Sequence, residues 1–476
     1  MIKINDLNKN IINAEYAVRG PIVIKAQELE SQGKKIIYCN IGNPQALKQK
    51  PLTYIRQALA LLEYPELLRN KETSEHFPKD IAERVKEIHK RYPIGTGAYS
   101  QSAGVPFIRE AIAEFIRSRD GIETNKDRII LTDGASKGVH AVISALIKDN
   151  KDGILIPIPQ YPLYSATLTL YGGQQIGYYL DEDNSWQLNE EILNNNIEKA
   201  IKKGIKPVGI AVINPGNPTG AVLSYDNIKM IINFSKRYNL AILADEVYQE
   251  NVYPEDLEFY SFAKVMSDMG EKDITLFSFH SVSKGFLGEC GHRGGYMEVR
   301  NIPEDVFAQF IKLQSISLCS NLSGQFVTYF MVLPPAEGDE SHELYIKERD
   351  GILNDLKKKA EILGTGLNNI KGLSVRIPQG AMYAFVKLDL PHKKGVDISK
   401  MDESERLEYD SKRDSDYCMA LLEETGICVV PGSGFGQLPG TLHFRTTFLP
   451  PKDEIEELVK KIELFHIDYV KKLINE

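Results

Sequence analysis

The fold is decided by one stretch of sequence, Arg128-Ile-Ile-Leu-Thr-Asp-Gly-Ala-Ser-Lys-Gly-Val-His-Ala-Val-Ile-Ser-Ala-Leu-Ile147. Its first five residues form a short β-type run, which predicts a buried strand, and Gly134 indicates a turn. The apolar residues after the turn recur at helical spacing, namely Val139, Val142, Ile143, Leu146 and Ile147. The stretch therefore predicts a strand, a turn and a helix, the repeating unit of an α/β protein.

The same alternation continues along the chain. Further strands are predicted at residues 153–157, 175–179, 208–213, 241–244, 274–279 and 294–299, and helices at 106–121, at 346–369 and near the end of the chain. This pattern predicts a mostly parallel central sheet flanked by helices. We expect a large domain over residues 91–335 and a smaller α+β domain over residues 336–476, to which residues 1–90 contribute. The polar run 390–416 is expected to be a solvated surface insertion.

The composition excludes several classes of protein. Among 476 residues, 57 basic and 65 acidic side chains give a net charge of −8, and the nine histidines do not cluster. Such a chain offers no basic stripe to nucleic acid, and no apolar run approaches the roughly 18 residues of a membrane span. Five cysteines without a Cys-x-x-Cys pair, and a start without a leader pattern, favour a reduced, cytoplasmic protein.

Most catalytic motifs are absent from the sequence. No complete Gly-x-Gly-x-x-Gly, P-loop or His-Glu-x-x-His pattern occurs, so neither a dinucleotide site nor a metal is expected. However, Gly134-Ala-Ser-Lys-Gly138 matches the Gly-x-Ser-x-Gly turn of serine hydrolases. A hydrolase built on Ser136 would also need an acid and a histidine, for which His280, His292 or His443 are available. The same residues also fit a phosphate site, because a helix N-terminus offers free N–H groups and a positive dipole end.

Ligands of open parallel sheets bind outside the carboxyl ends of the strands, so the residues after each predicted strand form the candidate site. These segments are Asp133–Ser136, Pro159–Tyr161, Asn214–Gly220, Asp245–Tyr248 and His280–Lys284. Together they offer an amine, an acid, amide and phenol groups and a phosphate-binding turn. That combination suits pyridoxal phosphate, an aldehyde on a pyridine ring with a phosphate arm.

Each requirement of pyridoxal phosphate has a candidate residue. Lys284 is expected to supply the amine of a Schiff base and to act as the general base. Asp245 would keep the pyridine nitrogen protonated, and Asn217 and Tyr248 would bond the 3-oxygen of the ring. The phosphate candidates are the amides of Ala135 and Ser136, the hydroxyl of Ser281, and Arg293, whose planar guanidinium binds oxyanions in a bidentate manner.

With these residues the sequence resembles the fold-type I pyridoxal-phosphate aminotransferases, and among them the alanine aminotransferases. The resemblance covers nearly the whole chain and begins with the short motifs at 217–220, 245–248 and 281–284. The longer stretches that look like this subfamily are Glu15–Ile22, Asn40–Pro44, Pro51–Gln57, Ile156–Tyr164 and Phe279–Gly295.

The resemblance implies further site residues. Tyr161 matches the aromatic residue that stacks on the pyridine ring, and Arg445 matches the arginine that binds the substrate α-carboxylate. Gly42 matches a backbone contact near that carboxylate, and Asn217 is also expected to contact the substrate. Tyr99 matches the tyrosine that reaches the phosphate of the neighbouring subunit, which implies a homodimer.

The implied activity is a ping-pong transamination in which L-alanine and 2-oxoglutarate give pyruvate and L-glutamate. The partners are then small amino acids and 2-oxo acids. Other activities stay open on the same fold, namely that of a glutamate:glyoxylate or another amino-acid aminotransferase, or of a lyase of the 1-aminocyclopropane-carboxylate synthase type. The Ser136 hydrolase and a binding module without catalysis are the remaining alternatives.

Overall fold

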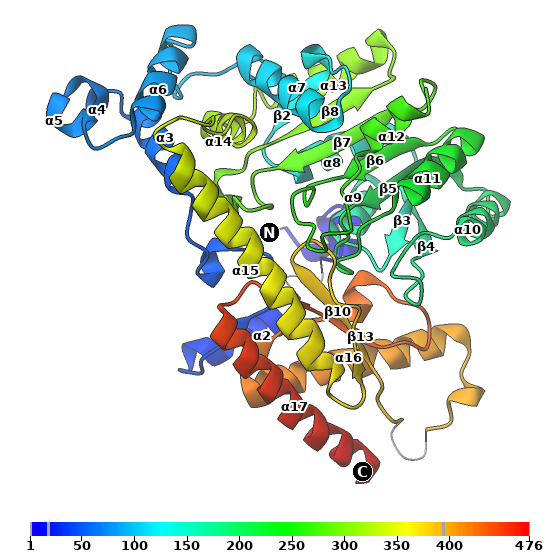
Figure 1. The fold of residues 1–476 in the computed structure, drawn as a ribbon. Helices are drawn as coiled ribbons and strands as arrows, with labels where there is room; N and C mark the ends of the chain where they lie inside the picture. The colour runs from blue at the N-terminus through cyan, green and yellow to red at the C-terminus, as the bar shows by residue number, and fades with distance from the viewer. Residues whose placement is uncertain (1, 17–19, 393–395, 476) are drawn as a thin grey trace.

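The computed structural model describes residues 2–16, 20–392 and 396–475, and its centre is a seven-stranded sheet in the order β2-β8-β7-β6-β5-β3-β4 (Figure 1). The strands are β2 (Ile129–Thr132), β3 (Asp152–Ile158), β4 (Gln174–Tyr179), β5 (Lys206–Ile213), β6 (Ala241–Asp245), β7 (Leu276–Ser281) and β8 (Gly295–Arg300). Only β8 runs antiparallel to its neighbours β2 and β7 within this described sheet. The predicted strands and the mostly parallel α/β fold are confirmed. Residues 17–19 of the stretch Glu15–Ile22 lie outside the described residues.

Helices cover both faces of this sheet. One face packs against α10 (Glu190–Lys202), α11 (Tyr225–Tyr238) and α12 (Phe262–Asp268), and the other against α8 (Ala135–Leu146), α9 (Leu163–Tyr171) and α13 (Glu304–Ile316). On β6, Ile242 and Ala244 enter the first apolar core and Leu243 enters the second. The strands are continuously apolar because successive side chains point to opposite faces and both faces are buried.

A third apolar cluster lies beside β2. It is formed by α3 (Thr53–Glu63), α6 (Lys79–Arg91), α7 (Pro106–Asp120) and α14 (Leu322–Val332). Helix α7 begins at Pro106, whose fixed φ suits a first helical turn, and ends where Gly121 adopts a φ of 68°. Both ends agree with the prediction from the sequence.

A second, smaller sheet has the order β12-β13-β10-β9 and is antiparallel. Its strands are β9 (Leu373–Ser374), β10 (Tyr383–Leu388), β12 (Val430–Pro431) and β13 (His443–Thr447), and β1 (Ile37–Tyr38) pairs separately with β11 (Ile427–Cys428). The helices of this part are α2 (Pro21–Ser31), α15 (His342–Asn368), α16 (Glu403–Thr425) and α17 (Lys452–Asn475). In Figure 1 the long helix α15, in yellow, runs from beside α3 down to these strands.

The first 90 residues pack against both parts of the molecule. Ile22, Ala26, Ile37 and Cys39 lie in the core of the smaller part, whereas the buried residues of α3 and α6 lie with those of α7 and α14. The N-terminal segment therefore contributes to two apolar cores. The domain bounds at residues 90 and 335 stay a prediction.

Short helices occupy the connections. They are α1 (Lys9–Asn13), α4 (Glu66–Arg69), α5 (Lys71–Ser74) and the 3-10 turns at Ile4–Asp6, Gln45–Leu47, Lys126–Arg128, Cys290–His292, Ile398–Lys400 and Gly432–Phe435. Across the described ranges, every helix is too short or too polar to cross a bilayer.

The described residues within 390–416 are mostly exposed or half-exposed, as predicted for a solvated segment, but part of the segment is a helix with buried aspartates. From Glu403 they form the first half of α16, while 393–395 lie outside the described part. Asp414 of this helix is fully buried and accepts hydrogen bonds from the backbone N–H and hydroxyl of Ser433, at 2.8 and 2.9 Å, and from Gln437 at 2.9 Å. Composition alone cannot separate the polar face of such a helix from a loop, and a buried aspartate looks polar in either setting.

Candidate active site

A cavity of about 460 Å³ lies at the carboxyl ends of β5, β6 and β7. Residues from the smaller sheet complete its wall, among them Arg445 on β13. The predicted site residues that line the cavity are Gly42, Ala135, Ser136, Tyr161, Asn217, Asp245, Tyr248, Ser281, Lys284, Arg293 and Arg445. Tyr99 is the exception, because its side chain is 72% exposed and lies outside this lining.

Asp245 lines the cavity with one carboxylate oxygen bonded and the other free. The hydroxyl of Tyr164 on α9 donates to Oδ2 at 3.0 Å, whereas Oδ1 has no hydrogen-bond partner among the described residues. Burial raises the pKa of Asp245 to about 6, although the Tyr164 hydroxyl, the backbone N–H of Val247 and the charge of Lys284 oppose this rise. A buried carboxylate oxygen without a partner is costly, and an N–H group of a ligand in the cavity would satisfy it.

Lys284 lies in the loop that follows β7, and its Nζ donates to the carbonyl oxygen of Gly42 at 2.8 Å. A Cβ at position 42 would collide with the hydroxyl of Tyr383 and would lie 3.0 Å from Nζ of Lys284. Only glycine allows the backbone to approach this closely. The amine therefore lies beside Gly42 and Tyr383, which come from two distant parts of the chain.

A group of donors that suits an anion lies at the N-terminus of α8. Gly134 precedes the helix with a φ of 79°, and no side chain caps the free amides of Ala135 and Ser136. A Cβ at Gly134 would come within 2.6 Å of a guanidinium nitrogen of Arg293, so the cation lies directly against this turn. Helix amides, a guanidinium and the hydroxyl of Ser281, which also lines the cavity, together fit a phosphate.

Arg445 is almost fully buried and meets the cavity from the opposite side. Its Nη1 donates to Oδ1 of Asn217 at 3.0 Å, and its Nη2 donates to the carbonyl oxygen of Asn40. The guanidinium lies over the rings of Tyr383 and Phe435, 4.2 and 4.6 Å from their centroids. No carboxylate pairs with Arg445 within the described chain, and a buried cation of this kind favours an anionic ligand.

Three tyrosines of the site were not predicted. The hydroxyl of Tyr16 lies 2.7 Å from that of Tyr161, and Tyr164 bonds Asp245. Tyr383 on β10 packs edge-on against Tyr248, with ring centroids 6.3 Å apart. Burial alone would raise the pKa of Tyr383, yet the charges of Lys284 and Arg445 lower it. Tyr16 and Tyr164 fall within stretches used for the family resemblance, but no sequence signal marks Tyr383.

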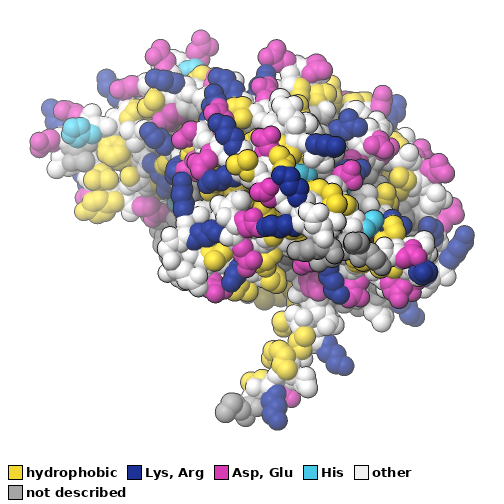
Figure 2. All heavy atoms as spheres, turned by 90° about the horizontal axis from the view of Figure 1, so that it is seen from below, with side chains coloured by type: hydrophobic (Ala, Val, Ile, Leu, Met, Phe, Trp, Pro, Cys, Tyr) yellow, Lys and Arg dark blue, Asp and Glu magenta, His cyan; other side chains and the backbone are white. Residues whose placement is uncertain are grey.

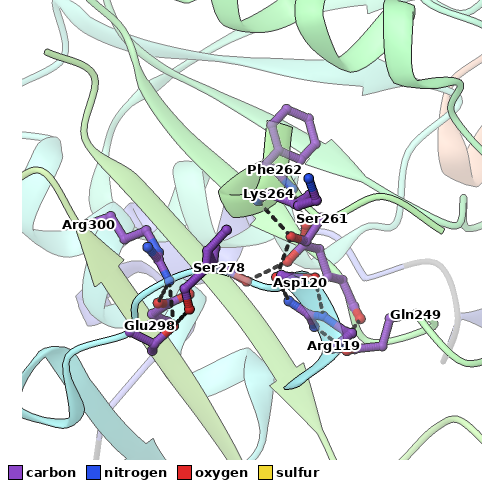
Figure 3. A network of polar contacts seen from close by, with 12 residues as sticks. Arg119, Asp120, Gln249, Ser261, Phe262, Lys264, Ser278, Glu298 and Arg300 are labelled. Atoms are coloured by element: carbon purple, nitrogen blue, oxygen red, sulfur yellow. Dashed lines mark hydrogen bonds and ion pairs between the residues drawn. The ribbon is translucent and has the colours of Figure 1, made fainter. Parts of the chain in front are cut away.

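A buried polar network supports the chain just beyond β6, and Figure 3 shows Arg119 and Gln249 of this network pointing toward each other. Glu246, which follows Asp245, accepts hydrogen bonds from the amide of Phe262 at 2.8 Å and from the hydroxyl of Ser278 at 2.5 Å. Burial raises the pKa of Glu246 to about 7. These contacts fix the segment that carries Asp245 and Tyr248.

The geometry does not assemble a serine hydrolase. No histidine is hydrogen-bonded to Ser136 among the residues that the structure describes. His280 is buried against Phe115, whereas His292 and His443 each lie beside a glutamate. Ser136 therefore lacks the base that the hydrolase alternative requires.

Comparison with known proteins gives matches that share one family and differ in their named activities. Residues 70–462 match the family described as aminotransferase class I and II. A protein of Dictyostelium discoideum named probable alanine aminotransferase, mitochondrial, is 49% identical, with 98% of this chain and 89% of the relative covered. Glutamate–glyoxylate aminotransferase 2 of Arabidopsis thaliana is 44% identical, with 98% and 95% covered. The solved alanine aminotransferase of Pyrococcus furiosus superposes with a TM-score of 0.77 at 28% identity, covering 97% of this chain and all of that chain.

The prediction of a cytoplasmic protein is wrong. The Dictyostelium relative is named mitochondrial, as is alanine aminotransferase 1 of Arabidopsis thaliana, which is 48% identical with 98% of this chain and 87% of the relative covered. The prediction rested partly on the five cysteines without a Cys-x-x-Cys pair, a pattern that argues only for a reducing compartment. That argument does not separate the cytoplasm from the mitochondrial matrix, because both are reducing.

Proposed function

Since the chain belongs to the class I and II aminotransferase family, we propose that it transfers the amino group of L-alanine to 2-oxoglutarate, giving pyruvate and L-glutamate. The relatives and the solved structure named alanine aminotransferase support this choice of substrates. The observation that carries it is that a lysine amine, a buried carboxylate oxygen without a partner and a buried arginine line one cavity.

The residues of the cavity fit pyridoxal phosphate. When bound, this cofactor supplies a carbonyl that condenses with amines and a protonated ring that accepts electrons. Lys284 would hold it covalently, and Oδ1 of Asp245 would accept the ring N–H. The groups for the phosphate are the amides of Ala135 and Ser136, the hydroxyl of Ser281 and the guanidinium of Arg293.

Three further residues would orient the ring. Tyr161 would cover one face, and the hydroxyl of Tyr248 would bond the 3-oxygen. Because Oδ1 of Asn217 already accepts a hydrogen bond from Arg445, its amide group is left to donate to the same oxygen. Arg445 would therefore couple the substrate's position to that of the ring.

Lys284 is the proposed general base. Arg445 would bind the α-carboxylate of the substrate through its two terminal nitrogens and so direct the Cα–H bond toward the Lys284 amine. Lys284 would then take the proton from Cα of the substrate as the general base. Asp245, whose pKa of about 6 leaves it largely ionised at neutral pH, would hold the proton on the ring nitrogen throughout.

A Lys284→Ala substitution tests the site. Turnover should fall by about 10³-fold or more, because both the covalent attachment and the general base are lost. Borohydride should attach the cofactor to wild-type protein and not to the variant, as measured by mass spectrometry. Lys264→Ala, which removes a half-buried lysine that is paired with Asp268 and does not line the cavity, is the control. Full activity of Lys284→Ala would sink the assignment.

Initial rates with a panel of substrates test the reaction. Alanine with 2-oxoglutarate should be among the best pairs, and double-reciprocal plots should be parallel, as ping-pong kinetics require. The second candidate, glutamate with glyoxylate, is favoured by the relatives of that name. A clear preference for glyoxylate over both pyruvate and 2-oxoglutarate as acceptor would replace the first proposal with the second.

A further inference from the structure

One face of the smaller sheet carries both Arg445 and His443. These residues are two positions apart on β13, so their side chains project from the same face. On the neighbouring strand β10, Phe385 pairs with Arg445 and Lys387 pairs with His443. The face that presents the arginine to the cavity therefore continues into a polar end made by His443 and Lys387.

That polar end contacts a turn of the large part, residues 181–187, which follows β4. Nζ of Lys387 lies 3.2 Å from Oε2 of Glu182, and Nε2 of His443 lies 3.3 Å from Oε1. Arg376 donates to the carbonyl oxygens of Glu182 and Asp183, at 3.2 and 2.8 Å. Three basic side chains of the smaller part thus contact one turn, and two of them, Lys387 and His443, contact the carboxylate of Glu182.

The turn holds Glu182 in a defined position. The N–H of Trp186 donates to the carbonyl oxygen of Asp181 at 2.6 Å, and Asp181 forms a β-bridge with Gln187. Ser185 and Trp186 both have positive φ values, 52° and 61°. Burial of the indole, which is 5% exposed, helps to offset the cost of that backbone conformation.

Aromatic packing connects the turn to the arginine. The ring of Trp186 packs edge-on against Phe385 and His443, with centroids 5.8 and 6.2 Å apart. Phe385 stacks on His443 at 4.5 Å and meets Phe435 at 6.1 Å. Phe435 in turn lies under the guanidinium of Arg445. Since packed side chains transmit displacement, a shift at the turn would reach Arg445.

The charge of Glu182 is favoured in this setting. Burial alone would raise its pKa, yet the hydrogen bonds and charges of His443 and Lys387 lower it. Its side chain is 21% exposed, so these ion pairs are only partly screened by solvent. Neutralising this carboxylate would leave Lys387 without its anion and would weaken the contact with His443.

We propose that Glu182 is a positioning residue: by holding His443 and Lys387 against the large part, it sets the position of β13 and hence of the Arg445 guanidinium. Glu182 itself touches neither substrate nor cofactor. The inference rests on the proposed function in one respect, because it takes Arg445 as the group that binds the substrate carboxylate.

The first test compares the steady-state kinetics of wild-type holoenzyme with Glu182→Gln, which removes the charge and keeps the size. KM for alanine and for 2-oxoglutarate should rise about threefold to tenfold, while kcat stays within about twofold, because substrate orientation is impaired and the chemical groups are intact. Glu182→Asp, which keeps the charge, should recover part of the loss.

Glu110→Gln is the matched control. Glu110 also pairs with two basic side chains, Arg91 and Lys126, but all three lie in the large part and none lines the cavity. This variant should keep the KM and kcat of the wild type. It therefore separates the effect of this particular contact from the general effect of neutralising a paired glutamate.

The second test uses a probe that the chain already carries, since Trp186 is its single tryptophan. The indole is covered by Phe385 and His443, so loosening of the contact should expose it. Acrylamide should quench the emission of the Glu182→Gln holoenzyme at least about twofold more strongly than that of wild type or Glu110→Gln.

A raised KM together with stronger quenching supports the proposal. An unchanged KM, or a raised KM with unchanged quenching, overturns it. If the wild type does not turn over alanine at all, the proposed function fails, but the role of Glu182 can still be tested. The affinity of the holoenzyme for maleate, a dicarboxylate, is then measured in place of KM. Weaker maleate binding by Glu182→Gln with stronger quenching then supports the role of Glu182, and equal binding overturns it.

Discussion

The carboxylate of Asp245 is held by a single side-chain hydroxyl, and this arrangement decides which oxygen is free. Tyr164 on α9 donates to Oδ2, which leaves Oδ1 without a hydrogen-bond partner among the described residues. The same hydrogen bond stabilises the ionised form of the carboxyl and so counteracts the rise in pKa that burial causes. Tyr164 thus determines which oxygen of Asp245 is bonded, and it favours the ionised form of the carboxyl group.

Tyr164→Phe should move the acid limb of the pH–rate profile upward. Without the hydroxyl, the pKa of Asp245 rises further, so the ionised form that holds the ring proton is lost at a higher pH. The shift should be about half a unit to one unit, as expected for one hydrogen bond. Tyr178→Phe, which removes a buried hydroxyl bonded to the carbonyl of Ala211, should leave the profile in place. Equal profiles for Tyr164→Phe and wild type would contradict this role.

Among single residues, the sequence predicts the site residues that directly follow strands. It misses the residues whose place in the site depends on how two parts of the molecule pack together. Lys284 and Asp245 could be found because the carboxyl ends of parallel strands meet at one edge. Tyr383 could not, since its contact with Gly42 depends on how the smaller sheet meets the large part. Tyr164 could not be assigned a role, because its bond to Asp245 depends on the direction in which α9 crosses the sheet.

Among the elements, the strands of the central sheet were predictable because both of their faces are buried. Their runs are continuously apolar and bounded by turns, which distinguishes them from amphipathic helices. Helix α16 was not predictable in its first half. There the polar residues include Asp414, whose burial depends on Ser433 and Gln437, residues that come later in the chain.

Asp414→Asn should change how stability depends on pH. Burial raises the pKa of Asp414 to about 6, above the 3.8 of an exposed aspartate, so the folded state binds this proton more tightly than the unfolded state. Its contribution to stability is therefore present below about pH 4 and is lost as the pH rises through about 6. The free energy of unfolding of the wild type, relative to the variant, should fall by on the order of 2 kcal/mol over that range.

Urea unfolding at pH 4, 5, 6 and 7 measures this difference. Comparing each wild-type value with the variant at the same pH cancels the other titrating groups, provided that the two proteins have equal m values. Asp416→Asn, which changes an exposed aspartate of the same helix, serves as the control. A stability advantage of the wild type that grows as the pH rises would contradict a raised pKa for Asp414.

At the scale of the whole molecule, the one predicted site residue that stands apart is Tyr99. It is 72% exposed and outside the lining of the cavity, as a residue contributed to a second copy would be. We propose that the enzyme is a homodimer in which Tyr99 reaches the phosphate group of the partner's site.

Sedimentation equilibrium should therefore give twice the 53.6 kDa of one chain. Tyr99→Phe should keep that mass and bind pyridoxal phosphate about tenfold more weakly, because a hydrogen bond to a charged group is lost. Fluorescence titration of the cofactor-free protein measures that affinity. A mass of one chain, or unchanged affinity in the variant, would contradict the shared site.

Figure 2 shows acidic and basic side chains interspersed over the face of the molecule seen from below, so neither sign of charge dominates that face.

The strand order of the central sheet governs how the chain folds while it is being synthesised. β2 is an edge strand paired with β8, so Ile129 has no strand partner until Glu298 has been synthesised. Likewise, β1 pairs with β11, so Ile37 has no strand partner until Ile427 has been synthesised. Pairing across such long separations is slow, and open strand edges promote aggregation in the meantime. A chain still attached to the ribosome before residue 427 is therefore the form of this protein in greatest need of a chaperone.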